Sequence, residues 1–236
     1  MSRLNCYRCF RPQKLCWCDT LQAMPTRARF VLLMHPKEFK HEKGNTGRLT
    51  HLCLRNSEIL MGRDFDEHAE VQARLSNPNY LSVLLYPGKE AHNLSVAGPV
   101  ATELTAKPLQ VFLLDATWSA ARKMLRLSPS LQRLPRIMFT PTAPSRYRIK
   151  QQPQEGCLST LESVHELLLA LQRAGLDDYL LPDQLLAAFA RMQNFQMECA
   201  ADPNLGGYRR RAYSEPTDRQ KTHGRSKERR RYIKIG

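Results

Sequence analysis

The sequence predicts an α/β fold in which a mostly parallel β-sheet is flanked by helices. Short apolar runs of strand length recur along the chain, and turn residues or helical patterns separate them. This alternation indicates parallel strands joined by helices. The chain has 236 residues, of which 42% are hydrophobic and 25% are charged, so it is long enough and apolar enough to bury one large core.

The first eighteen residues hold four of the seven cysteines, in the pattern Cys6-x2-Cys9-x6-Cys16-x-Cys18. Four thiols at this spacing can surround one tetrahedral zinc ion, with free thiols or an iron–sulfur cluster as the alternatives. Protein would fill all four positions of such a zinc and leave no room for a catalytic water. The metal would therefore fold the head of the chain and take no part in a reaction.

One strand and two helices are predicted in the first half of the chain. The apolar run at residues 29–34 reads as a buried strand that ends at a His-Pro turn. Asn45 or Thr46 is placed to cap a helix that runs from residue 47 to about residue 54. Residues 66–75 are expected to form a second helix.

Three further strands and two long helices are predicted after residue 79. The apolar runs at residues 80–86, 109–114 and 137–139 have strand length. Apolar residues at helical spacing predict two helices that pack together. These residues are Leu161, Val164, Leu167, Leu168 and Leu171 in the first helix, and Leu185, Leu186, Phe189 and Met192 in the second.

Composition divides the chain into three parts: a Cys-rich head (residues 1–24), a folded body (25–205) and a basic tail (206–236). The tail contains runs of arginine and almost no apolar periodicity, so it has too little apolar surface to order by itself. It is either an RNA contact or a solvated tail that aids solubility.

The formal net charge of +14 predicts a polyanion as the partner, with a generic basic surface as the alternative. A membrane partner is disfavoured, because no run of 18 apolar residues exists and the most basic segment has little apolar content. The first residues lack the apolar region of a secretory signal, and the clustered cysteines suit reduced thiols. The sequence therefore predicts a cytoplasmic protein, and it indicates no obligatory protein partner.

A strand, a short turn and a helix follow one another in residues 112–125, and Asp115 stands at the carboxyl end of the strand. In open α/β sheets ligands bind at this edge, beside the N-terminus of the next helix. The alternative is that Asp115, Thr117 or Ser119 only caps that helix. Trp118 in the turn offers a flat apolar face that a cap does not require. Three basic residues add positive charge to the same helix: Arg122, Lys123 and Arg126.

The segment Asp115-Ala116-Thr117-Trp118 resembles the signature of the DTW-domain family, the tRNA-uridine aminocarboxypropyltransferases, with Ala116 as an inserted residue. The similarity runs from residue 6, including the Cys-rich head, to about residue 200. Several blocks in order make it far more specific than one motif. The other similar blocks are His35-Pro36-Lys37-Glu38, Asn45-Thr46-Gly47-Arg48-Leu49, Leu85-Tyr86-Pro87-Gly88, Tyr147-Arg148-Ile149-Lys150 and Leu158-Ser159-Thr160-Leu161-Glu162.

The resemblance implies a fold related to the SPOUT methyltransferases, with a deep topological knot, and S-adenosylmethionine as the donor. The implied acceptor is N3 of a variable-loop uridine in tRNA (position 47), and methylthioadenosine is the implied second product. A Rossmann-type methyltransferase would show a Gly-rich turn after its first strand, and here that strand ends in His35-Pro36. A SPOUT-like RNA methyltransferase with the same donor, or a zinc-containing RNA-binding factor without chemistry, are the alternative functions.

Asp115 is the candidate catalytic residue, either as a general base toward N3 or as a group that holds the donor. Ser159 and Glu162 also fit a capping box, which is a complete structural explanation of both residues. Candidate donor-binding residues are Tyr86, Pro87, Gly88, Thr117, Trp118, Ser119, Leu158, Ser159, Thr160 and Glu162. Candidate RNA-binding residues are His35, Arg48, Arg122, Lys123, Arg126, Arg146, Arg148 and Lys150.

Overall fold

The computed structural model describes residues 4–11, 13, 16, 18–41, 44–96, 102–150 and 156–202. Within them, six strands form one all-parallel sheet in the order β2-β1-β5-β3-β6-β4, which confirms the predicted parallel sheet. The basic tail predicted for residues 206–236 lies outside the described residues. The strands are β1 (Arg29–Met34), β2 (Ser57–Met61), β3 (Leu81–Leu85), β4 (His92–Asn93), β5 (Leu109–Asp115) and β6 (Arg136–Met138).

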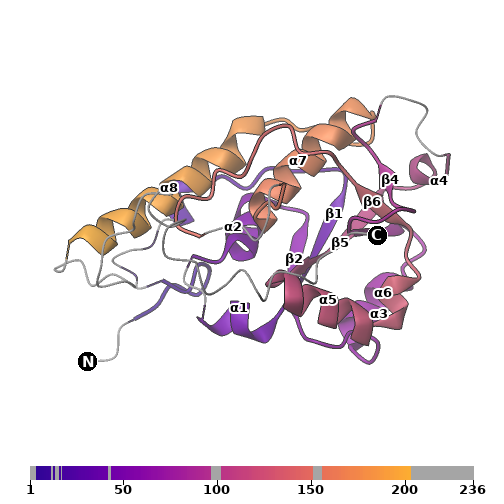
Figure 1. Ribbon diagram of the computed structural model, residues 1–236, viewed down its shortest axis with the longest axis horizontal. Helices are drawn as coiled ribbons and strands as arrows, with labels where there is room; N and C mark the ends of the chain where they lie inside the picture. Colours follow the sequence, from indigo (N-terminus) through magenta and orange to yellow (C-terminus); the bar gives the residue numbers. More distant parts are fainter. Residues whose placement is uncertain are drawn as a thin grey trace, which may run out of the picture.

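Helices cover both faces of this sheet, with α2, α7 and α8 on one face and α3, α5 and α6 on the other (Figure 1). None of the helices in the described part of the chain is long and apolar enough to cross a membrane. The helices are α1 (Pro36–His41), α2 (Thr46–Cys53), α3 (Ala69–Leu75), α4 (Thr102–Thr105), α5 (Trp118–Leu127), α6 (Pro129–Gln132), α7 (Thr160–Arg173) and α8 (Pro182–Ala201), and a short 3-10 helix, η2, spans Cys18–Thr20.

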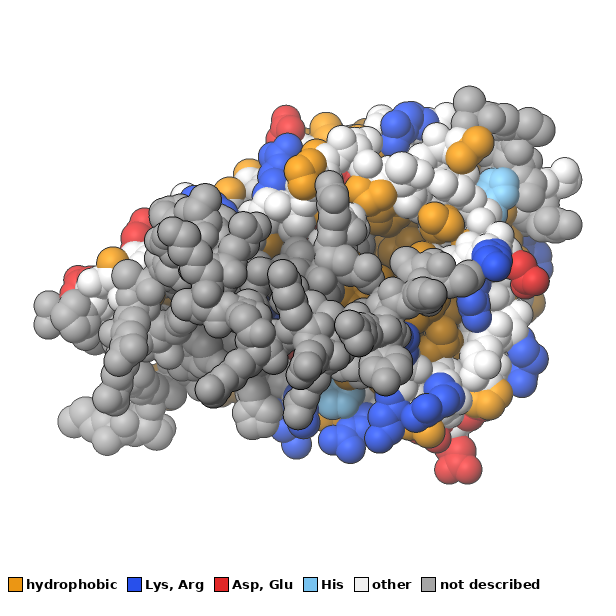
Figure 2. Space-filling view, in the orientation of Figure 1, with side chains coloured by type: hydrophobic (Ala, Val, Ile, Leu, Met, Phe, Trp, Pro, Cys, Tyr) orange, Lys and Arg blue, Asp and Glu red, His pale blue; other side chains and the backbone are white. Residues whose placement is uncertain are grey.

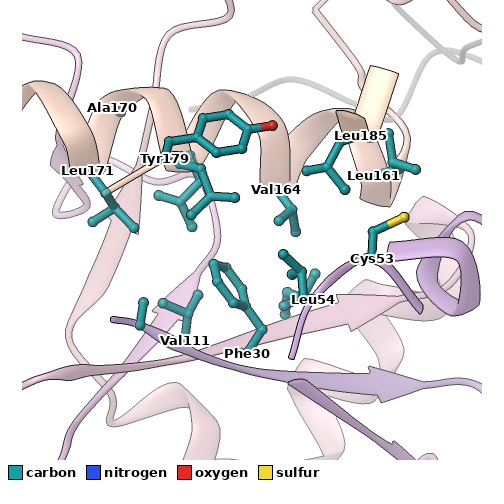
Figure 3. Packing of buried hydrophobic residues seen from close by; sticks show 14 of the residues in the cluster. Phe30, Cys53, Leu54, Val111, Leu161, Val164, Ala170, Leu171, Tyr179 and Leu185 are labelled. Atoms are coloured by element: carbon teal, nitrogen blue, oxygen red, sulfur yellow. The ribbon is translucent and has the colours of Figure 1, made fainter. Parts of the chain in front are cut away.

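The larger core lies between the sheet and the α7 face. Val164 and Leu171 of α7 point from the helix toward Phe30 of β1 and Val111 of β5, and all four side chains are fully buried (Figure 3). The opposite faces of the same strands are also buried, for example Val31, against α3 and α5. Burial on both faces is why β1 and β5 are continuous apolar runs and not alternating ones.

The predicted elements differ from the observed ones mainly at the edge of the sheet. The edge strand β2 was not predicted, because Ser57-Glu58-Ile59 has neither a continuous apolar run nor a clear alternation. The helix predicted over residues 66–75 begins only at Ala69. The helix predicted from residue 47 is α2, and Asn45 is its N-cap, as one of the two predicted alternatives required.

The carboxyl ends of the central strands meet where neighbouring helices leave the sheet in opposite directions. Met34 of β1 is in register with Asp115 of β5, and the His35 amide donates to the Asp115 carbonyl at 3.0 Å. After β1 the chain reaches α2 on one face, whereas after β5 it enters α5 on the other face. Such a switch point opens the crevice in which open α/β sheets bind ligands.

Candidate active site

Asp115 is the last residue of β5, and its side chain is buried between the N-termini of two helices. Its Oδ1 accepts a hydrogen bond from Thr160 Oγ1 at 2.5 Å, and its Oδ2 accepts one from Asn45 Nδ2 at 3.3 Å. Thr160 is the first residue of α7, and Asn45 is the N-cap of α2. The carboxylate therefore faces the positive ends of two helix dipoles, which favour a negative charge there.

Gly47 allows α2 to approach this carboxylate closely. A Cβ atom at position 47 would lie 2.3 Å from Asp115 Oδ2, which is far inside van der Waals contact. Asn45 fixes the same turn, because its Oδ1 accepts the Arg48 amide at 2.6 Å while its Nδ2 donates to Asp115. A residue without a side chain is thus required at position 47 for Asn45 and Asp115 to meet.

Burial raises the pKa of the Asp115 carboxyl above the ordinary aspartate value. The hydrogen bonds from Thr160 and Asn45 and the positive charges of Lys150 and Arg48 act against this, since each stabilises the ionised form. The group therefore takes up a proton more readily than an exposed aspartate. A carboxylate with a raised pKa suits a general base that works near neutral pH.

The turn after Asp115 separates the cap of α5 from the carboxylate. Thr117 is the N-cap of α5, and its Oγ1 accepts the Ala120 amide at 3.4 Å and lies 3.3 Å from Ser119 Oγ. Capping of α5 was the alternative role for Asp115, Thr117 or Ser119, and Thr117 is the residue that fills it. Trp118 begins α5 and remains 37% exposed, although aromatic side chains of this size usually contribute to a core.

The turn after β3 lies beside the start of β6. The Tyr86 amide donates to the Ile137 carbonyl at 3.2 Å, and the Arg136 guanidinium lies 5.7 Å from the centre of the Tyr86 ring. Burial raises the pKa of the Tyr86 hydroxyl, and the charges of Arg122 and Arg136 oppose this shift. Tyr86 is therefore close to basic residues of both α5 and β6.

Figure 2 shows a hollow lined by hydrophobic side chains between the regions of β6 and α5. The elements that flank it carry two groups of predicted donor-binding residues. Tyr86, Pro87 and Gly88 follow β3 next to β6, and Thr117, Trp118 and Ser119 stand at the start of α5. An apolar hollow with a few polar groups at its rim is the usual form of a small-molecule site.

Glu162 is fully engaged by protein groups. Its two carboxylate oxygens accept the Ser159 amide at 2.9 Å, the Ser159 hydroxyl at 2.7 Å and the Arg146 amide at 2.5 Å, and the Ser145 hydroxyl donates to both. Ser159 caps α7 and completes the predicted capping box with Glu162. These contacts account for Ser159 and Glu162 structurally, and Leu158, just before them, is half-buried.

Lys and Arg side chains form a row over α1 and α5, along the lower margin of the molecule in Figure 2. Arg122, Lys123 and Arg126 of α5 are exposed. His35 lies beside the row, and its pKa is lowered by burial and by the charges of Arg63, Lys37 and Lys123. Lys37 of α1, Lys123 of α5 and Arg63, which follows β2, thus lie near one imidazole next to the end of β1.

The remaining predicted RNA-binding residues occupy two different environments. Arg146, Arg148 and Lys150 are exposed on the segment between β6 and α7, and the Gln193 side chain of α8 holds the backbone of Arg146 and Arg148. Arg48 is instead only 9% exposed and lies between the rings of Phe10 and Phe39. This placement does not favour the phosphate contact that was predicted for Arg48.

The four head cysteines form one cluster whose sulfur atoms all lie within 4.8 Å of one another. The Cys6 and Cys18 sulfurs are 3.8 Å apart, and so are those of Cys9 and Cys16. Four sulfurs bound at about 2.3 Å around a tetrahedral zinc would be separated by about 3.8 Å. All seven cysteines are free thiols, so this cluster fits a zinc ion held only by protein.

The carboxyl edge thus gathers His35, Tyr86, Asp115, Trp118 and Thr160 from separate parts of the chain. Arg126 lies away from this group, in the last turn of α5. Sequence reasoning missed the contacts of Asn45 and Gly47 with Asp115, and it missed Arg63 and Arg136. A glycine inside a predicted helix was the available signal for Gly47, because glycine disfavours helices unless a close approach requires it.

Known proteins with related sequences align with most of the chain. Residues 3–197 match the family described as DTW domain. A tRNA-uridine aminocarboxypropyltransferase 2 of Drosophila melanogaster is 33% identical over 177 residues, which are 72% of this chain and 67% of the relative. The Mus musculus protein of the same name is 30% identical over 208 residues (86% of this chain, 67% of the relative). tRNA-uridine aminocarboxypropyltransferase A of Arabidopsis thaliana is 25% identical over 223 residues (82% and 81%), and no solved structure matches the chain.

Proposed function

The chain belongs to the DTW-domain family, and on this premise we propose that it is a tRNA-uridine aminocarboxypropyltransferase. The observation that carries the proposal is the extent of the match. It covers residues 3–197, which include the Cys-rich head, Asp115 and the start of α7. The relatives that bear this name align with 72% to 86% of the chain.

The proposed reaction moves the 3-amino-3-carboxypropyl group of S-adenosylmethionine to N3 of a variable-loop uridine of tRNA. N3 forms a bond to the methionine-side carbon, the bond between that carbon and the sulfonium breaks, and sulfur keeps the electron pair. Methylthioadenosine leaves, and the N3 proton goes to a base. The pocket must hold N3 about 3 to 3.5 Å from the methionine-side carbon, in line with the bond from that carbon to sulfur. A different alignment would transfer the methyl group.

Asp115 is the proposed acceptor of the N3 proton. Burial raises its pKa, and each carboxylate oxygen has one described donor, which leaves lone pairs for a further hydrogen bond. The alternative role is that Asp115 holds the amine or ribose of the donor. If Asp115 is the base, removing its charge abolishes transfer and leaves donor binding largely intact. If it holds the donor, transfer and donor binding are lost together.

We place the donor in the apolar hollow between β6 and α5. The turn of Tyr86, Pro87 and Gly88 follows β3, which pairs with β6, and Trp118 begins α5. Aromatic faces stabilise a sulfonium weakly, which suits a charge that disappears during the reaction. Leu158 and Thr160 at the start of α7 complete the proposed donor site. The positive end of that helix dipole suits the donor carboxylate.

The catalytic body (residues 25–205) is proposed to be SPOUT-related and knotted. Its parallel sheet, its ligand edge at the carboxyl ends of the strands and the lack of a Gly-rich turn after β1 support this kinship. In the same proposal the head holds zinc for a structural purpose, and the protein works in the reducing cytoplasm, where seven free thiols persist.

The proposed tRNA surface is the basic row over α1 and α5, together with Arg146, Arg148 and Lys150. These exposed cations flank the carboxyl edge, so phosphates bound there would bring a loop nucleotide to Asp115. Arg63 and Lys37 join this surface because both lie close to His35.

The test is to incubate the metal-loaded protein with S-adenosylmethionine and tRNA and to separate the small products. Methylthioadenosine, with an aminocarboxypropyl-uridine in the digested tRNA by mass spectrometry, is the expected result. S-adenosylhomocysteine with a methylated nucleoside would favour the methyltransferase alternative. Binding of tRNA with neither product would favour a non-enzymatic RNA-binding factor.

A further inference from the structure

The Cys-rich head packs directly on α2, the helix whose first turn meets Asp115. Leu52, near the end of α2, is buried against Cys9 and Cys18. The head also contacts α8, where the Arg11 guanidinium lies 5.1 Å from the centre of the Phe195 ring. The head is thus fixed to the body at more than one point, and α2 spans the distance from the cysteines to the candidate active site.

Phe10 makes a second contact between the head and α2, from an unusual backbone conformation. Its φ is +57°, and it is the one non-glycine residue with positive φ among the described residues. Its amide donates to the Cys6 carbonyl at 2.8 Å, so the cysteine loop itself holds this conformation. Phe10 as a whole is 51% exposed, yet its ring centre lies 4.3 Å from the Arg48 guanidinium and 5.7 Å from the Phe39 ring centre.

Arg48 is a buried cation whose guanidinium lies between aromatic rings, and the charge of Asp115 acts on it without forming an ion pair. Its guanidinium lies between Phe10 and Phe39, at 4.8 Å from the latter ring centre, and Nη2 donates to the Phe39 carbonyl at 3.0 Å. No carboxylate in the described part of the chain forms an ion pair with it, and its buried Nε has no hydrogen-bond partner there. The two ring faces therefore help to keep this charge in place, together with the charge of Asp115.

Two successive hydrogen bonds connect the Arg48 backbone to Asp115, in addition to the effect of the Arg48 charge on that carboxylate. Its backbone amide donates to Asn45 Oδ1 at 2.6 Å, and Asn45 Nδ2 donates to Asp115 Oδ2 at 3.3 Å. A movement of Arg48 would rotate the Asn45 amide and alter the hydrogen bond to Asp115. Gly47, between these residues, lies so close to the carboxylate that a Cβ atom there would be 2.3 Å from Asp115 Oδ2.

We infer that Phe10 is a positioning residue for the transfer reaction: its ring holds Arg48, and through Asn45 the first turn of α2, against Asp115. The metal-folded head thereby determines the geometry of a site in which it has no chemical part. This inference rests on the proposed function for its kinetic consequences, whereas the contacts from Phe10 to Asp115 are independent of it.

The test compares three substitutions at Phe10 with one at Tyr7, which lies in the same cysteine loop and is 92% exposed. Metal content is measured first, and every variant is expected to keep one zinc per chain. Phe10→Ala is expected to lower kcat about tenfold to a hundredfold, in line with a displacement of about 1 Å at a reacting group, with KM for tRNA unchanged. Tyr7→Ala is expected to match the wild type.

Two further variants separate the ring from apolar bulk. Phe10→Tyr keeps the ring and is expected to restore most of the rate, while Phe10→Leu keeps bulk alone and is expected to resemble Phe10→Ala. If Phe10→Ala loses zinc, Arg48→Lys supplies the same test from outside the head, since lysine retains the charge but not the planar stack. Full activity of Phe10→Ala or of Arg48→Lys, or rescue by Phe10→Leu equal to that by Phe10→Tyr, would overturn the inference.

Amide hydrogen exchange provides a readout that does not depend on transferase activity. Phe10→Ala is expected to speed exchange in the first turn of α2 relative to wild type, and Tyr7→Ala is not. Unchanged exchange in Phe10→Ala would contradict the coupling even if the enzyme is active. Faster exchange in a protein that transfers nothing would instead contradict the proposed function and leave the coupling standing.

Discussion

Asp115 and Glu162 are two carboxylates at the same edge of the sheet, and each is only 4% exposed. Their surroundings differ in the number of hydrogen-bond donors. Glu162 accepts bonds from two amides and two hydroxyls, which occupy the lone pairs of both oxygens. From the residues that the structure describes, Asp115 accepts one hydrogen bond at each oxygen, from Thr160 and Asn45.

Burial alone therefore does not distinguish a structural carboxylate from the proposed proton acceptor. Glu162 ties the segment after β6 to the start of α7, and it has no capacity left for a ligand. Asp115 keeps part of its capacity, and burial raises its pKa. The few hydrogen bonds to Asp115 leave its carboxylate free to accept a proton from a ligand, which suits the role proposed for it.

Exchanging each carboxylate for its amide is the most direct test of this difference. Asp115→Asn is expected to lower kcat by about 10²- to 10⁴-fold, the usual contribution of a general base, while donor binding by calorimetry stays within a few-fold. Equal loss of transfer and donor binding would assign Asp115 to holding the donor.

Glu162→Gln is expected to act on stability and not on chemistry. The new NH₂ group must face the backbone N–H of Ser159 or of Arg146, so two hydrogen-bond donors point at each other. Such a buried, unsatisfied pair lowers the free energy of unfolding by about 1 to 3 kcal/mol. Thermal unfolding should show a Tm lower by several degrees, with kcat at low temperature near the wild-type value. A loss of kcat equal to that of Asp115→Asn would remove the distinction between the two carboxylates.

Gly47→Ala tests whether the close approach of α2 to Asp115 is required. The added methyl would lie 2.3 Å from Asp115 Oδ2, so either the carboxylate or the helix must move. We expect a loss of about 10²-fold in kcat, because small displacements at a reacting group are costly. Gly44→Ala is the matched control, since a methyl there meets only Met192 Sδ at 3.4 Å, and steady-state kinetics should show no change.

Much of the central sheet was predictable because its strands are buried on both faces. β1 and β5 are continuous apolar runs, and the first polar residue after the β5 run, Asp115, indicated the ligand edge. The edge strand β2 escaped prediction, since one half-exposed face leaves no continuous apolar pattern. Asn45 was expected only as a helix cap, a role that it fills with its Oδ1.

The contacts between Asp115 and other parts of the chain could not be predicted, because they depend on tertiary packing. Asn45 and Thr160 are 70 and 45 residues from Asp115 in the chain, and no local pattern specifies that their helices converge there. The burial of Arg48 between Phe10 and Phe39 has the same cause. A sequence shows that an arginine is present, but its exposure depends on which rings pack around it.

Thr160→Val removes one of the two hydrogen bonds that Asp115 accepts, because valine lacks the hydroxyl group but has nearly the volume of threonine. The Thr160 hydroxyl stabilises the ionised carboxylate, so its loss raises the pKa of Asp115 further. Because a base must be ionised, the acid limb of the pH–rate profile should move to higher pH, with less change in rate on the alkaline side. Thr160→Ser retains the hydroxyl and should keep the wild-type profile. An unmoved limb in Thr160→Val would assign that limb to another group.

Lys123→Ala is expected to have the smallest effect on activity. An exposed cation at this position is proposed to contact tRNA and not to act on the buried residues around Asp115. Lys123 is exposed on α5, near His35, so it is placed to meet a phosphate. Loss of one phosphate contact should weaken tRNA binding several-fold and reduce the slope of log Kd against log salt by about one, with kcat unchanged. Arg173→Ala, at the far end of α7, is the control and should leave the salt slope as it is. A lower kcat with an unchanged slope would instead indicate that Lys123 acts in the reaction at the carboxyl edge and not in tRNA binding.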